Sequence, residues 1–476
     1  MADPLSEKAR VEAALRYIAD EAVRYLASID ERPVRTGRVD EALRRFGGPL
    51  PEDGVGAMPA LEELVAARDA ALASSGPRFF HWVTGGGTPA ALAADWLTSA
   101  LDQNAFAHDS TPLGTRVETV AIEWLKDLFG IPASWGGVLV TGATMANFVA
   151  LAAARRWWAQ RYDVDVDDRG FAGLPPLPVF SSGYIHVSAT KALAMLGIGR
   201  STVRRFARDA VGRLDLDALD AALRDLRGAP AIVVANAGEV NAGDFDPIAL
   251  MADLAERHGA WLHVDGAFGL FAAVSPRTRP LVDGIAGARS VIADAHKWLN
   301  VPYDCGFAFV RDASALPPIF GIGAPYLPDS GVMYGVLGPE ASRRARGLAV
   351  WATLRAYGRR GYREMVERHL DLAQRVARRV DASPELERLA DVPLNIVCFR
   401  VHPKGLDDEG ALNELNTRVG AALLEDGRIY VGTTRYSGKV AFRPAIVNWR
   451  TTDADVDTIV DVIRDLAARA TAAPIH

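Results

Sequence analysis

Short apolar runs alternate with helical stretches through the middle of the chain. Between the runs, apolar residues recur at the three- and four-residue spacing of helices, as at Leu216, Leu219 and Leu223. Strands that are apolar throughout are buried on both faces, so the pattern predicts an α/β domain with a mostly parallel sheet sandwiched by helices. The expected strands are residues 137–140, 179–180, 202–203, 231–235, 261–264 and 291–293.

The first 75 residues have a different pattern, which predicts a helical arm. Apolar residues at Val11, Leu15, Ile18 and Leu26 mark one amphipathic helix, and a Pro/Gly-rich connection separates it from a second helix at residues 59–73. Such an arm buries little by itself. We expect it to pack either on a second subunit or on the body of its own chain.

The C-terminal part predicts a small α+β domain. A long helix at residues 363–380 leads to three strands of alternating character, and residues 453–468 close the chain as a helix. The three strands are expected at residues 396–401, 429–431 and 440–443. The predicted organisation is therefore an arm over 1–75, an α/β domain over 76–369 and an α+β domain over 370–476.

Composition narrows the class of protein. The 476 residues are 49% hydrophobic and 24% charged with a net charge of −6, which gives no reason to expect nucleic acid or an anionic membrane as a partner. Cys305 and Cys398 form no disulfide framework or metal-binding spacing, so no metal site is predicted. With no signal peptide and no apolar run long enough to span a bilayer, we expect a cytoplasmic protein.

Candidate chemistry lies just after the predicted strands, where ligands bind in such folds. Ala143 and Thr144 follow one strand and open a helix, whose N-terminus favours a phosphate group. Asp265 ends another strand and can pair with a heterocycle nitrogen, while the small Ala267 leaves room for a flat ring. His186 follows a third strand.

Lys297 is the most informative residue of the chain. Lysine is rare here, and Lys297 lies between His296 and Trp298 after an apolar run that ends at Asp294. An amine in such a setting can lose its proton and attack a carbonyl, which is the requirement for Schiff-base chemistry. Together with the phosphate-binding turn and Asp265, this lysine predicts a pyridoxal 5'-phosphate (PLP) site.

These motifs resemble those of the group II PLP-dependent amino-acid decarboxylases, the family of the aromatic and glutamate decarboxylases. The resemblance covers residues 10–467 and is strongest at residues 294–298, at residues 263–267 and around His186. It implies the type I fold of PLP-dependent transferases. It also implies a homodimer with its active sites at the subunit interface and an N-terminal arm that embraces the partner.

The resemblance also implies roles for individual residues. Lys297 would hold PLP as a Schiff base, Asp265 would keep the pyridine nitrogen protonated, and His186 would stack on the ring and orient the substrate. Ala267 would lie against the other ring face. The phosphate contacts would come from Ala143, Thr144 and His296, with Asp294 as a supporting hydrogen-bonding residue.

Two places depart from the family pattern. The acid that returns a proton to the substrate would be Tyr334, but the loop before it is several residues shorter than in animal aromatic decarboxylases. Glu239 stands where many relatives carry a hydroxyl residue, and it either binds a polar substrate or pairs with an arginine.

The favoured prediction is decarboxylation of an aromatic L-amino acid to its amine. The aromatic preference rests on Phe80, His81, Trp82 and Phe106, which form either a pocket wall or a loop with half-buried rings. The alternatives are an aldehyde synthase, which couples decarboxylation to oxidative deamination, another carbon–carbon lyase, and a non-catalytic protein of the same fold.

Overall fold

The computed structural model describes residues 3–36, 39–323 and 331–472. Its centre is a seven-stranded sheet in which β7 runs antiparallel to both neighbours and the other pairs are parallel. The order across the sheet is β1 (Gly136–Val140), β7 (Gly306–Val310), β6 (Ser290–Asp294), β5 (Trp261–Asp265), β4 (Ile232–Asn236), β2 (Val179–Ser181) and β3 (Val203–Arg205).

Every residue of β4, β5, β6 and β7 is buried, which indicates that both faces of this sheet are covered by helices. One helix, α6 (Ala143–Gln160), packs against β1, β5, β6 and β7 and against α8 (Val187–Met195). Another, α10 (Ile248–Arg257), packs against β4 and β5. The remaining helices of this region are α4 (Pro89–Leu101), α5 (Pro112–Phe129), α7 (Val166–Arg169), α9 (Leu216–Asp225) and α11 (Pro317–Phe320).

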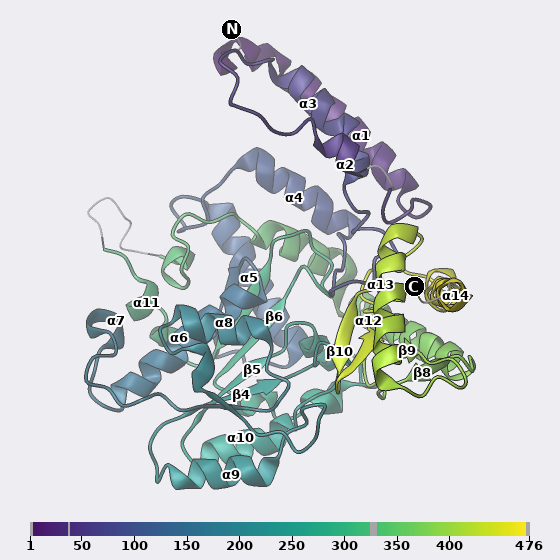
Figure 1. Ribbon diagram of the computed structural model, residues 1–476. Helices are drawn as coiled ribbons and strands as arrows, with labels where there is room; N and C mark the ends of the chain where they lie inside the picture. The colour runs from purple at the N-terminus through teal and green to yellow at the C-terminus, as the bar shows by residue number, and fades with distance from the viewer. Residues whose placement is uncertain (1–2, 37–38, 324–330, 473–476) are drawn as a thin grey trace.

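A second, smaller sheet of four antiparallel strands lies beside the first domain (Figure 1). Its order is β10 (Thr433–Tyr436), β11 (Lys439–Phe442), β9 (Phe399–Val401) and β8 (Leu386–Arg388), and it packs with α13 (Glu409–Asp426) and α14 (Asp453–Ala472).

The long element α12 (Gly347–Asp381), which consists of two helical parts joined by a kink at Gly358 (φ 60°, ψ −175°), contributes to both hydrophobic cores. Its buried residues up to Leu370 pack in the core of the large sheet, whereas those from Leu372 onward pack in the core of the small one. Just before this change of core lies His369, which accepts a hydrogen bond from Trp298 Nε1 (2.8 Å) and donates one to the carbonyl of Asn448 (3.0 Å). The helix therefore connects the residue after Lys297 directly to the small domain.

The N-terminal segment extends away from the body of the molecule (Figure 1). It contains α1 (Val11–Ser28), α2 (Val39–Leu43) and α3 (Ala57–Ala66), and α1 buries none of its residues. Leu15 and Val23 on α1 are 65% and 63% exposed. The arm thus carries an apolar surface that its own chain leaves uncovered.

The predicted α/β fold with a mostly parallel sheet and a small C-terminal α+β unit is confirmed, and all six predicted strands of the large sheet overlap observed strands. One predicted strand was wrong. Residues 429–431 form no strand, because only Tyr430 makes a single bridge, to Phe79. Among the described helices, none is long and apolar enough to cross a membrane.

Candidate active site

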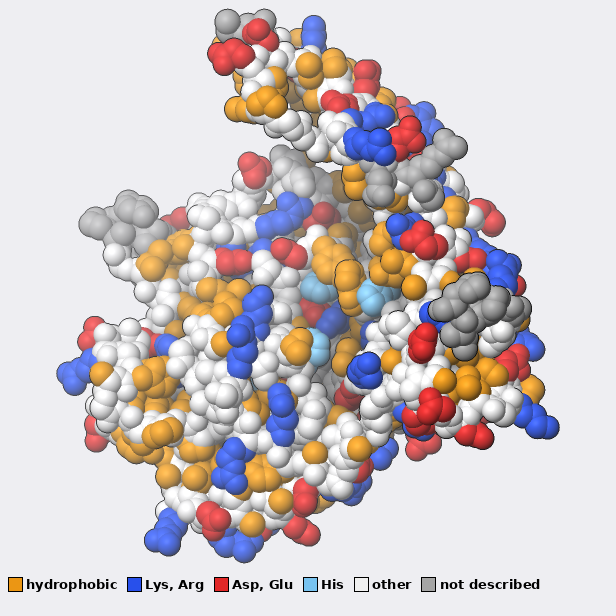
Figure 2. Space-filling model, viewed as in Figure 1, with side chains coloured by type: hydrophobic (Ala, Val, Ile, Leu, Met, Phe, Trp, Pro, Cys, Tyr) orange, Lys and Arg blue, Asp and Glu red, His pale blue; other side chains and the backbone are white. Residues whose placement is uncertain are grey.

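Three neighbouring strands of the large sheet end at one cavity. In the sheet register Asn236 at the end of β4 pairs with Asp265 at the end of β5, and Asp294 ends β6 just before Lys297. The cavity is lined by Val83, Tyr184, His186, Asn236, Gly238, Glu239, Val240, Asp265, Ala267, Phe268 and Lys297. Figure 2 shows histidine side chains gathered around a hollow in this central part of the molecule.

Lys297 is held at the cavity by Asp294. Its Nζ lies 2.8 Å from Asp294 Oδ2, and the Asp294 side chain is only 3% exposed. The other oxygen of Asp294 accepts a hydrogen bond from the backbone N–H of Ala143 at 2.5 Å. One carboxylate thus joins the reactive amine to the first residue of α6.

Asp265 is held in place by a buried chain of hydrogen bonds. Asn147 on α6 donates to Asp265 Oδ2 (2.9 Å), and its amide oxygen lies 2.7 Å from His263 Nε2. On the other side of the imidazole, His263 Nδ1 lies 2.9 Å from Ser290 Oγ. Burial lowers the pKa of His263 to about 4, so the ring is neutral and donates to Asn147 while it accepts from Ser290.

His186 caps the N-terminus of α8. Its Nδ1 accepts a hydrogen bond from the backbone N–H of Ser188 (3.2 Å) and lies 2.7 Å from the Ser188 hydroxyl. Burial lowers the pKa of His186, an effect that the nearby Asp265 opposes. The neutral imidazole therefore carries its proton on Nε2.

The start of α6 forms a tight turn beside His296. Gly142 has φ +153°, and a Cβ atom there would lie 3.0 Å from the His296 ring and 3.3 Å from Asp294. A Cβ on Gly306 would lie 2.6 Å from the backbone of Gly142, so β7 and this turn approach as closely as glycine permits. His296 in turn stacks on Tyr303 with ring centres 4.3 Å apart.

This residue set fits the cofactor that the sequence predicts. Lys297 supplies an amine, Asp265 a fixed carboxylate for a ring nitrogen, and Ala267 a small side chain in the same cavity. The N-terminus of the eighteen-residue helix α6 favours an anion, and Ala143 and Thr144 are its first two residues. A flat, phosphorylated pyridine aldehyde has the groups that these residues would bind.

The four aromatic or imidazole residues expected at the substrate pocket do not line the cavity. Phe80 is 1% exposed and lies in the core of the small domain, because its backbone bonds to Tyr430 and Ala445 direct the side chain there. His81 lies between Trp82 and Tyr430, with ring centres 4.7 Å away from each. Trp82 is 63% exposed and directly precedes Val83.

Phe106 and Tyr334 lie together, away from the cavity lining. Phe106 packs against the segment of Gly335, and the Tyr334 hydroxyl lies 2.9 Å from Thr119 Oγ1. Burial raises the pKa of Tyr334 to about 12. Residues 324–330, at the start of the loop in which Tyr334 was predicted to act, lie outside the described residues, so the role of Tyr334 stays a prediction.

Arg443 is the main polar residue near the site that the sequence reasoning missed. It follows β11, is 5% exposed, and its Nε and Nη2 have no hydrogen-bond partner among the residues that the structure describes. Burial lowers its pKa to about 10, although Glu239 acts in the opposite direction, and its charge lowers the pKa of His186. The sequence feature that could have pointed to Arg443 is its position as a charged residue directly after the apolar residues 440–442.

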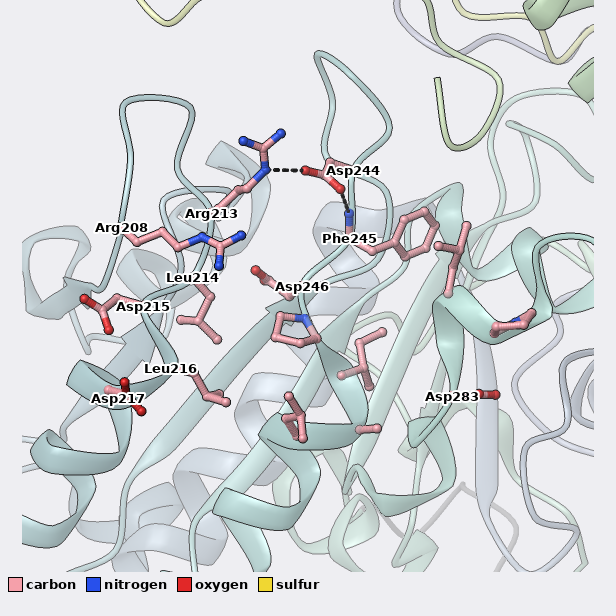
Figure 3. A pocket seen from close by; sticks show the side chains of 16 residues that line it. Arg208, Arg213, Leu214, Asp215, Leu216, Asp217, Asp244, Phe245, Asp246 and Asp283 are labelled. Carbon is pink, nitrogen blue, oxygen red and sulfur yellow. Dashed lines mark hydrogen bonds and ion pairs between the residues drawn. The ribbon is translucent and has the colours of Figure 1, made fainter. Parts of the chain in front are cut away.

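A separate and larger hollow, of about 730 Å³, lies beside the segment that follows Glu239 (Figure 3). One ion pair lies in its lining, where Asp244 accepts a hydrogen bond from Arg213 Nε (3.3 Å), and Asp244 also accepts one from the Tyr184 hydroxyl (2.6 Å). Lys297, Asp265 and His186 are not among its lining residues. The cavity at the strand ends is therefore the candidate active site.

Comparison with known proteins agrees with this assignment. The pyridoxal-dependent decarboxylase conserved domain matches residues 70–402. The chain is 30% identical to the aromatic-L-amino-acid decarboxylase of Bacillus atrophaeus over 82% of this chain and 81% of that protein. It is 33% identical to the L-2,4-diaminobutyrate decarboxylase of Rhizobium meliloti (strain 1021) over 88% of this chain and 84% of that protein.

Solved structures show the same fold. Two crystal structures of mouse CSAD, one of them in apo form, each superpose with a TM-score of 0.89 at 26% identity; they cover 97% and 96% of this chain and 99% of the CSAD chain. The conserved domain spans more than half of the chain, and the residues at the end of the parallel strands fit its cofactor. The chain belongs to the pyridoxal-phosphate-dependent amino-acid decarboxylases, which are carboxy-lyases.

Proposed function

We propose that the protein converts an aromatic L-amino acid to the corresponding amine and carbon dioxide, with Lys297 as the residue that carries PLP. The observation that supports this most strongly is the position of Lys297 and Asp265 in one cavity, each held by a buried hydrogen-bonding partner. The bound cofactor accepts the electron pair that is left when carbon dioxide departs.

The residues around the cavity would prepare the substrate for that loss. Asp265, fixed by Asn147, would keep the ring nitrogen of the cofactor protonated. His186 would present its Nε2–H to the substrate carboxylate, and the buried charge of Arg443 would favour an anion nearby. Asp294 would form an ion pair with Lys297 Nζ each time the substrate amine displaces the lysine.

The phosphate group would bind at the start of α6. Ala143 and Thr144 would contribute the helix N-terminus, and His296 would lie beside it with its ring fixed by Tyr303. Ala267 leaves space for the flat ring in the cavity.

The aromatic substrate class is supported by the aromatic decarboxylase among the relatives and by one feature of the chain. Trp82 is 63% exposed and directly precedes Val83, which lines the cavity. The other expected aromatic residues pack elsewhere and give this proposal no support.

Product analysis tests the reaction type. Protein loaded with PLP is incubated with single L-amino acids, and the products are identified. Amine with carbon dioxide in equal amounts is the expected result, whereas aldehyde with ammonia and peroxide would refute the proposed reaction in favour of an aldehyde synthase. The Lys297→Ala variant is expected to lose both turnover and the visible absorbance of the bound cofactor.

We also propose that the protein is a homodimer in which the arm packs on the partner subunit. The support is the apolar surface of α1, where Leu15 and Val23 remain exposed. Mass measurement in solution is expected to give a dimer, and Leu15→Glu together with Val23→Glu is expected to shift the mass toward the monomer. A wild-type monomer would contradict the proposal.

A further inference from the structure

Glu239 is a buried carboxylate inside the active-site cavity. It lines this cavity with Lys297 and His186 and is only 5% exposed. The side chains beside it in the lining include Val83, Val240 and Phe268, which offer no hydrogen bonds. A carboxylate in such surroundings has lost most of its hydration. Its burial costs free energy unless a hydrogen-bonding partner replaces the lost water.

The carboxylate of Glu239 is fixed in place by its own loop. It accepts hydrogen bonds from the backbone N–H of Ala242 (2.8 Å) and from the side-chain amide of Asn241. Asn241 in turn accepts a hydrogen bond from the Thr434 hydroxyl of the small domain (2.6 Å). The position of the carboxylate is therefore set by both domains before any ligand arrives.

These bonds leave part of the carboxylate unused. Each oxygen accepts one hydrogen bond from the loop, and a carboxylate has about four acceptor positions. Within the described residues Glu239 forms no ion pair, although Arg443 is near enough to act on its charge. Burial raises the pKa of Glu239, and the hydrogen bonds from Ala242 and Asn241 act in the opposite direction.

Only one part of an amino-acid substrate can supply the missing hydrogen bond. The α-amine is committed to the cofactor in place of Lys297, and the α-carboxylate has no hydrogen to donate. Within the substrate, a donor for Glu239 would therefore lie on the side chain.

We propose that Glu239 is a specificity-determining residue that accepts a hydrogen bond from a donor group on the substrate side chain. The site thereby favours amino acids whose side chain carries a hydroxyl, a ring N–H or an ammonium group over analogues of the same shape without one. This inference rests on the proposed decarboxylase function and deepens it. A buried acceptor left without its partner makes the analogue bind less well.

Matched substrate pairs test the inference. Tyrosine is compared with phenylalanine for a neutral donor, and 2,4-diaminobutyrate with 2-aminobutyrate for an ammonium group. In at least one pair, kcat/KM of the wild-type protein is expected to favour the donor-bearing member about 10- to 150-fold, the range for a hydrogen bond to a charged group. The difference is expected mainly in KM, because the donor is remote from the bond that breaks.

Two variants of Glu239 distinguish a hydroxyl donor from an ammonium donor. Glu239→Met removes every acceptor and is expected to bring the ratio within the pair close to one. Glu239→Gln keeps an acceptor oxygen but no charge, so it is expected to retain most of the preference for a hydroxyl and to lose most of that for an ammonium group. Glu256→Gln, an exposed position on α10, is the matched control and is expected to leave both ratios unchanged.

A loop-holding role alone would give a different result. If Glu239 only held its loop in place, Glu239→Met would lower kcat/KM for both members of a pair by the same factor. The melting temperature of the variant would fall as well. Calorimetric binding of tyrosine and phenylalanine to the Lys297→Ala protein, which cannot turn over, gives a readout independent of catalysis. There too, the donor-bearing ligand is expected to bind more tightly, and Glu239→Met in the same background is expected to remove the difference.

The outcomes distinguish this inference from the proposed function. Decarboxylation with equal kcat/KM within both pairs, or a preference for acidic amino acids such as glutamate, would overturn the role of Glu239 and leave the decarboxylase intact. Absence of turnover with every amino acid would instead overturn the proposed function.

Discussion

The hydrogen-bond chain that ends on Asp265 can be broken at one side chain. Asn147→Leu keeps the number and branching of the heavy side-chain atoms but removes the bond to Asp265 Oδ2 at 2.9 Å and the bond to His263 Nε2 at 2.7 Å. A hydrogen bond to a charged group contributes about 1.5–3 kcal/mol, and each 1.4 kcal/mol corresponds to a factor of ten. If Asp265 positions the cofactor ring, the dissociation constant of PLP is therefore expected to rise about 10- to 150-fold.

Cofactor affinity is measured by titrating the protein with PLP and following visible absorbance, alongside the melting temperature. The melting temperature is expected to fall as well, because a buried N–H of His263 left without an acceptor costs about 1–3 kcal/mol. The decarboxylation rate at saturating PLP reports whether Asp265 still acts once the cofactor is bound.

A second buried asparagine provides the matched control. Asn416 on α13 is fully buried and bonds to the backbone of Val401 and Leu412, far from the cavity lining. Asn416→Leu is expected to lower the melting temperature without changing PLP affinity. The reasoning is refuted if Asn147→Leu binds PLP as tightly as the wild type, or if both variants weaken binding equally.

Three further predictions concern charge and protonation. Burial lowers the pKa of His263 to about 4 and of His369 to about 3 from an ordinary 6.5, so only the unfolded chain takes up these protons and stability falls as the pH drops from 6.5 toward 4. Calorimetry near pH ~5.5 should detect proton uptake on unfolding, and its absence would contradict the assignment. Arg343→Met leaves Glu118 buried without its 2.8 Å ion pair and should lower the free energy of unfolding by about 3–5 kcal/mol, whereas Arg344→Met at a more exposed pair should cost about 1 kcal/mol or less. Tyr334→Phe should slow amine formation about 100-fold or more if Tyr334 is the acid, and an unchanged rate would remove it from the mechanism.

Sequence reasoning located the residues that follow strands and missed those whose role depends on distant contacts. Lys297, Asp265 and His186 could be found because the carboxyl ends of parallel strands meet at one edge of a sheet. Asn147 lies in an Ala-rich helix with no local sign of function. Its importance arises only from a contact with Asp265, 118 positions away in the chain.

The predicted substrate pocket depends on pairing that the sequence does not show. The aromatic cluster at Phe80 to Trp82 was conspicuous in the sequence, but pairing of the Phe80 backbone with Tyr430 and Ala445 turns that side chain into the small-domain core. The small-sheet strands β8 and β10 were also missed, because they carry polar and partly exposed residues that give no apolar run. Tertiary pairing decided these features, and it is not encoded in local periodicity.

The course of α12 limits how the molecule can move. Because one helix belongs to both cores and His369 ties Trp298 to Asn448, the small domain cannot swing away from the cavity without bending this helix or breaking those bonds. The entropy needed to bring the small domain against the residue after Lys297 is lost when the chain folds, so the substrate does not have to supply it at every turnover.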